Sequence, residues 1–166
     1  MNDSEDPQAL LPESLIDAEV DIDALEASAW QERYLLSWIG QQRLVIPSQW
    51  VSEIIVVERT RILPLPFYDS MLLGVVHHEG QIVPLITLWT QPQFAQAQRL
   101  RETLSAVRLG AAVGELAGVG LVVDQINGTL THAQLTQLQE TSASMPVQLF
   151  QPEAISPRIW HPQTSL

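Results

Sequence analysis

The chain has 166 residues, of which 46% are hydrophobic and none is cysteine. This length and apolar content suit one ordinary domain, or two small subdomains that share a core. The lack of cysteine excludes disulfides, thiolate nucleophiles and cysteine-ligated zinc or iron–sulfur sites. The formal net charge of −11 disfavours nucleic-acid binding, which needs a cationic surface.

The sequence also bears on the membrane. No apolar run reaches the roughly 18 to 20 residues that span a bilayer. The acidic amino terminus lacks the basic and apolar regions of a signal peptide. We therefore expect a cytoplasmic protein without direct membrane insertion.

Residues 1–29 form an acidic leader with nine acids and no base, whereas every base of the chain is an arginine beyond residue 30. An apolar stripe at helical spacing runs through it, formed by Leu11, Leu15, Ala18, Ile22 and Leu25. The stripe favours an amphipathic helix, while the charge favours a disordered segment. Both readings stay open.

The body begins with β-strand patterns. We expect strands at 34–39 and 43–46 paired as a hairpin around the turn 40–42, then a short helical or turn segment at Trp50 and Val51. Four β-branched residues at 54–57 predict a buried strand. Prolines fix an extended connection at 61–66.

A second hairpin is predicted from 74–78 and 81–86, with Glu79-Gly80 as its turn. Pro84 within the returning strand indicates an edge or a bulge. Further on, the sequence predicts the following elements: a linker or surface helix at 91–102, strands at 104–109 and 118–126, a turn at Asn127-Gly128, a short helix around Leu135 and Leu138, and a last strand at 147–150. Short strands with regular turns indicate small barrels rather than a parallel sheet.

Few residues have the spacing that catalysis or metal binding requires. His77 and His78 should point to opposite faces of a strand, and the two ligands His77 and Glu79 make a weak site, so we expect no metal. Nucleophile and phosphate-loop motifs are missing, which predicts a protein that is not an enzyme and needs no cofactor. Asp124 ends an apolar strand before a turn, where a structural aspartate is usual.

At residues 72–88 the sequence LLGVVHHEGQIVPLITL resembles the central motif of the CheW-like family. That motif has an apolar pair, Gly-Val, a hairpin ending in Arg-Gly, and an apolar strand with proline. Three more segments are similar to the family in consistent order: Tyr34-Leu35-Leu36 followed by Gly40, Val51-x-Glu53-Ile54 followed by Pro64-Leu65-Pro66, and Gly120-Leu121-Val122-Val123-Asp124.

The resemblance implies a mainly β fold of two small SH3-like five-stranded barrels around a shared core, with a few short helices. The CheW-like domain would cover 30–155, followed by a carboxy-terminal tail at 156–166. The implied function is a non-catalytic adaptor that couples chemoreceptors to a CheA-type histidine kinase in chemotaxis, phototaxis or pilus-driven motility. Its partners would be the kinase regulatory domain and the cytoplasmic tip of a methyl-accepting chemoreceptor, in arrays at the inner face of the membrane.

The resemblance also implies a partner-binding surface. Its candidate residues are Val51, Glu53, Gly74, His77, His78, Glu79 and Gly80. The chain departs from the family at three places: Glu79 replaces a basic residue, Thr87 replaces an aspartate, and the last hairpin is hard to find between 138 and 147, which predicts an incomplete or differently closed second barrel. The alternative hypothesis is a diverged CheW-like regulatory or structural domain that no longer couples receptors and acts through its acidic leader.

Overall fold

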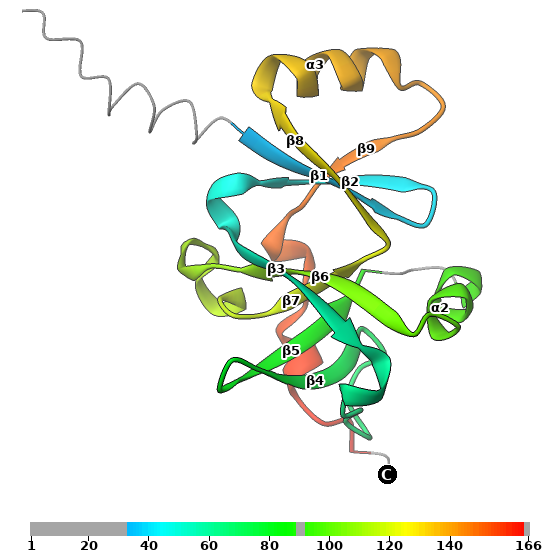
Figure 1. Cartoon of the computed structure of the whole chain (residues 1–166), viewed down its shortest axis with the longest axis vertical. Helices are drawn as coiled ribbons and strands as arrows, with labels where there is room; N and C mark the ends of the chain where they lie inside the picture. Colours follow the sequence, from blue (N-terminus) through cyan, green and yellow to red (C-terminus); the bar gives the residue numbers. More distant parts are fainter. Residues whose placement is uncertain (1–32, 89–91, 165–166) are drawn as a thin grey trace, which may run out of the picture.

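The computed structural model describes residues 33–88 and 92–164, and these fold into two β-sheets with few helices (Figure 1). The strand order is β8-β1-β2-β9 in one sheet and β3-β6-β7-β5-β4 in the other. The mainly β fold class is therefore confirmed. One sheet has the expected five strands, and the other has four within the described ranges. The leader and its helical stripe lie outside these ranges.

The four-stranded sheet is built around the first hairpin. Its strands are β1 (Arg33–Ile39), β2 (Gln42–Pro47), β8 (Gln125–Thr131) and β9 (Val147–Leu149). A two-residue turn at Gly40, whose φ is 60°, joins β1 to β2, since Ile39 already pairs with Gln42. The predicted hairpin is confirmed. The last strand, β9, pairs parallel to β2.

The five-stranded sheet contains the second hairpin. Its strands are β3 (Val51–Glu58), β4 (Leu72–His78), β5 (Gln81–Thr87), β6 (Thr103–Leu109) and β7 (Gly120–Val123). Glu79 and Gly80 both have positive φ, 48° and 79°, as the tightest antiparallel turns require, which confirms the predicted turn. Pairing of β5 with β7 begins at Leu85, so Pro84 lies where one side of β5 has no strand partner.

The two cores share the central strands β5, β6 and β7. Leu121 and Val107 point into the core between the two sheets, together with Ile46 of β2. Val122 and Ala106 point the other way, into the interior of the curled five-stranded sheet. Strands buried on both faces explain the nearly continuous apolar runs in this part of the sequence.

Within residues 33–88 and 92–164, two α-helices accompany the sheets. The polar segment after β5, expected to be a linker or a surface helix, forms the helix α2 (Pro92–Arg99). The second helix, α3 (His132–Thr141), begins with a capping box between Thr131 and Gln134 and buries Leu135, which confirms the predicted short helix. Within the described ranges, none of the helices has the length and apolarity needed to cross a membrane.

Two predictions around Asp124 are wrong. The single strand expected at 118–126 is divided, because the chain passes at Asp124 from β7 in one sheet to β8 in the other. The expected turn at Asn127-Gly128 lies within β8, where Gly128 has a φ of 96° and the pairing with β1 shifts register. The glycine therefore serves a β-bulge instead of a hairpin turn.

Asp124 fixes this crossing. Its backbone N–H donates to the carbonyl of Trp38 at 2.8 Å, and its Oδ2 accepts from the N–H of Gly40 at 2.6 Å. Arg101 lies beside the same carboxylate at 3.5 Å. The residue thus ties the first turn to the passage between the sheets, and its expected structural role is supported.

We predict that Asp124→Ala lowers the free energy of unfolding by about 1.5–3 kcal/mol, because the Gly40 N–H loses a charged acceptor. Chemical denaturation of the full chain measures the change. Glu115→Ala, at an exposed position, is the matched control and should stay within about 0.5 kcal/mol of the unsubstituted protein. Equal stability of the two variants would contradict the assigned role.

Candidate partner-binding site

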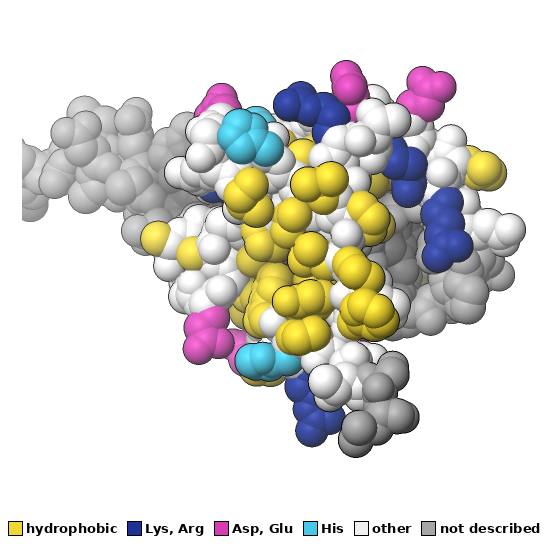
Figure 2. Space-filling view, turned by 90° about the horizontal axis from the view of Figure 1, so that it is seen from below, with side chains coloured by type: hydrophobic (Ala, Val, Ile, Leu, Met, Phe, Trp, Pro, Cys, Tyr) yellow, Lys and Arg dark blue, Asp and Glu magenta, His cyan; other side chains and the backbone are white. Residues whose placement is uncertain are grey.

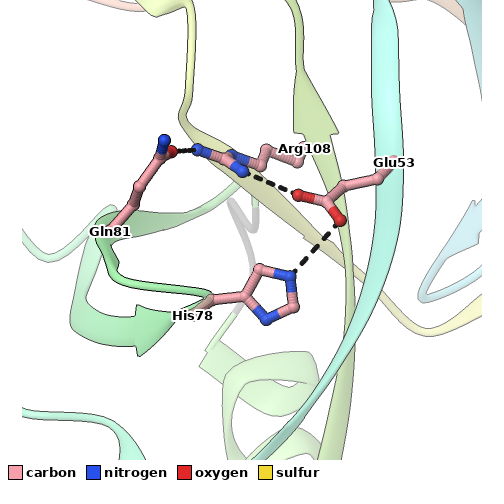
Figure 3. Close-up of polar contacts among 4 residues, drawn as sticks. All are labelled: Glu53, His78, Gln81 and Arg108. Carbon is pink, nitrogen blue, oxygen red and sulfur yellow. Dashed lines mark hydrogen bonds and ion pairs between the residues drawn. The ribbon is translucent and has the colours of Figure 1, made fainter.

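Glu53 lies at the centre of a polar cluster beside the second hairpin (Figure 3). It faces Arg108 across the β3–β6 pair, and Arg108 Nη1 donates to Glu53 Oε1 at 2.7 Å. The other guanidinium nitrogen, Nη2, donates to Gln81 Oε1. His78 Nε2 lies 3.3 Å from Glu53 Oε2. One carboxylate thus connects three strands: β3, β4 and β6.

The electrostatics of the cluster favour the ionised carboxylate. The hydrogen bond from Arg108, followed by that with His78, holds the pKa of Glu53 below its ordinary value of 4.5. The side chains of Glu53 and His78 remain 31% and 28% exposed. Solvent therefore screens the pair, and its contribution to stability is small.

The contact between Glu53 and His78 also joins the two outer strands of the five-stranded sheet, because β3 and β4 stand at opposite ends of the strand order. Further along β4, Val75 forms a β-bridge with Leu63, which lies in the connection between β3 and β4. The sheet curls on itself as a result, and the hairpin is held at a defined position relative to β3.

The two histidines of the hairpin point in different directions, as predicted. His77 is exposed and pairs with Ile82, whereas His78 turns toward Glu53. The structure also brings Glu79 near this cluster: one ligand atom from each of Glu53, His78 and Glu79 lies within 4.8 Å of the others. The alternation of side chains along one strand instead places Glu79 on the same face as His77, because it takes no account of β3 or of the turn.

Gly74 is buried and lies beneath the connection that precedes β4. A Cβ at this position would overlap the carbonyl oxygen of Leu63 and come within 3.0 Å of Ile62 Cγ2, and φ is +150°. Only glycine fits here without strain. The residue therefore positions Leu63 and the hairpin. Val51 is half-buried against the shared core, and Gly80 is exposed in the turn.

Arg108 and Gln81 were missed as members of the site. The only signal for Arg108 in the sequence is a charged residue within the apolar run 104–109, at a position that requires an acidic partner on a neighbouring strand. Gln81 carries no signal, because a polar residue after a turn is ordinary. Both assignments depend on strand pairing.

An apolar surface extends from the hairpin across β4 and β5. Leu63 pairs with Val75, and Val75 pairs with Pro84, so their side chains form a row; Ile82 lies two residues further along the same face. Leu63 and Ile82 are 65% and 63% exposed. Figure 2 views the molecule from the end that carries β4 and β5 and shows hydrophobic side chains gathered there. We call Leu63, Val75, Pro84 and Ile82 the apolar row.

Two sheets with a shared core and an ordered hairpin beside exposed apolar side chains define a small β-rich domain. Residues 33–149 match the family model described as CheW-like domain. Because the match covers more than half of the sequence, the chain belongs to the CheW-like domain family. The resemblance found in the sequence is thereby confirmed.

Comparison with solved structures finds the crystal structure of the scaffolding protein TtCheW from Thermoanaerobacter tengcongensis. The identity is 16% and the TM-score 0.43, and the match covers 61% of this chain. It spans 65% of TtCheW, slightly less than two thirds of that chain. Comparison with curated proteins gives no match.

We predict that Gly74→Ala destabilises the protein by about 1–3 kcal/mol through backbone strain, with a further loss from the overlap with Leu63. The matched control is Gly118→Ala, at a position that also has positive φ, 83°, but where an added Cβ meets nothing within 4 Å. Urea denaturation should show a larger loss for Gly74→Ala. An equal loss would mean that the close approach of Leu63 is unimportant.

The lowered pKa of Glu53 predicts how stability depends on pH. Because the folded value lies below 4.5, the contribution is present above that pH and is lost as pH falls through the folded value. The stability difference between the unsubstituted protein and Glu53→Gln should therefore shrink on acidification, as measured by urea denaturation at several pH values. Added salt should shrink it too. A difference that grows at low pH would refute the assignment.

Proposed function

We propose that this protein is a non-catalytic adaptor that couples chemoreceptors to a CheA-type histidine kinase in chemotaxis, phototaxis or pilus-driven motility. The family match over residues 33–149 carries the proposal, since membership supports a coupling adaptor in general terms. The protein would act in the cytoplasm, recruited to receptor arrays at the inner face of the membrane. The kinase regulatory domain and the receptor tip are its proposed partners.

The second hairpin and the adjoining end of β3 form the proposed kinase-binding surface. Its apolar row supplies the dry centre that protein interfaces need, and the cluster at Glu53 borders it with polar groups. Glu53 is fixed by Arg108 and His78, so little side-chain entropy is lost when a partner binds. This preorganisation supports a docking role.

Glu79 determines which partner suits the surface. The side chain is exposed at the tip of the hairpin, and it stands where the family has a basic residue. Like charges that meet across an interface cost several kcal/mol. We therefore propose that the cognate kinase presents a cationic or polar group opposite Glu79, which makes this adaptor specific for its own kinase.

The test is quantitative binding of the full chain to the regulatory domains of the CheA-type kinases of the native host. We expect Glu79→Arg to lower the affinity by at least about tenfold, or about 1.4 kcal/mol. Glu140→Arg, on the exposed face of α3 in the other half of the protein, is the matched control and should leave the affinity within about twofold. Absence of affinity for every host kinase and every receptor tip would overturn the proposal.

Deletion of residues 1–29 distinguishes the alternative hypothesis in the same assay. Unchanged kinase binding supports an adaptor that acts through the folded domain. Lost binding supports a diverged domain that acts through its acidic leader. The deletion removes nine carboxylates, so the comparison is made at two salt concentrations to separate contact from long-range attraction.

A further inference from the structure

We propose that Glu53, His78 and Glu79 bind a divalent zinc-type cation at the tip of the second hairpin. One ligand atom from each residue lies within 4.8 Å of the other two. The sequence predicted no metal because the hairpin alone supplies too few ligands on one face, and β3 contributes the third. The proposal does not depend on the adaptor function.

The spacing of the first two ligands already suits a tetrahedral ion. Zinc binds histidine nitrogen and carboxylate oxygen at about 2.0–2.2 Å, which separates two ligand atoms of a tetrahedron by roughly 3.3–3.6 Å. Glu53 Oε2 and His78 Nε2 are 3.3 Å apart. An ion can therefore replace the proton between them with little movement of either side chain.

Glu79 completes the site from the turn. Its backbone has a φ of 48°, in the left-handed region, and its side chain is exposed. A glutamate side chain with free rotation can close the remaining distance to an ion held by Glu53 and His78. Three protein ligands leave a fourth position for water.

Arg108 and Gln81 orient the metal-binding carboxylate of Glu53 through hydrogen bonds. Arg108 holds Glu53 Oε1 at 2.7 Å and is itself held by Gln81, so Oε2 is left facing His78. Metal-binding carboxylates are commonly oriented by such hydrogen bonds. The guanidinium repels a cation, but the carboxylate of Glu79 offsets this charge. The two carboxylates together outweigh the single arginine, so the cluster attracts a cation before one is bound.

The donor set determines which cation is expected. One imidazole nitrogen and two carboxylate oxygens suit zinc, whereas magnesium and calcium prefer oxygen alone. His77 cannot replace His78, because it lies on the other face of β4 and pairs with Ile82. His77 is therefore the matched control for the ligand His78.

Calorimetric titration of the full chain with zinc chloride at neutral pH tests the proposal, with magnesium chloride as the comparison ion. We expect one zinc site, and a loss of affinity of at least about tenfold in both His78→Ala and Glu79→Gln, because even the loss of a residue that only orients a metal ligand costs about 10–100-fold. His77→Ala should stay within about twofold. The acidic leader is present in every variant, so any zinc it binds is a common background.

A second measurement uses the unsubstituted protein and needs no variant to fold. Zinc should shift the imidazole ¹⁵N resonances of His78 in the NMR spectrum and leave those of His77 in place. Zinc affinity that is equal in His78→Ala and the unsubstituted protein would overturn the proposal. So would equal affinity for magnesium, or an unshifted His78 resonance at saturating zinc.

Discussion

The burial of β5, β6 and β7 on both faces is the constraint on which the rest of the structure depends. One face packs against the four-stranded sheet and the other fills the curl of the five-stranded sheet. Both faces are apolar, so they differ in the size of the side chains that each can hold. A Cβ on Gly120 would come within 2.7 Å of Leu85 Cδ2, and Ala106 lies beside it. A slip of one residue would force Leu121 into this narrow space, and the register is therefore fixed by steric exclusion.

The same packing positions the candidate site. Because β5 is held between β7 and β4, the hairpin it forms with β4 starts from a rigid base. Gly74 allows Leu63 to lie against β4, and Glu53 reaches His78 from the opposite edge of the sheet. The hairpin tip is thus an extension of the core. This rigidity suits a surface that binds a partner without rearrangement.

Charge links the two proposals for this tip. Glu53 and Glu79 together outweigh the single arginine, Arg108, so the local charge is negative when His78 is neutral. A bound divalent cation would make it positive. A cationic group of the kinase opposite Glu79 would then be repelled, so bound zinc would oppose the proposed kinase contact at this tip. Kinase binding and zinc binding are measured separately, so each proposal stands or fails on its own result.

The sequence by itself determined the local features. Alternating apolar residues, the turns at Gly40 and at Glu79-Gly80, and the helix at His132–Thr141 follow from interactions between near neighbours in the chain. The family motif indicated the hairpin as the candidate partner-binding surface. Only the tertiary structure decided that the chain changes sheets at Asp124 and that Glu53 meets His78 and Arg108, across 25 and 55 residues. Such contacts depend on which strands pair and on how the sheet curls, and packing of the whole core sets both.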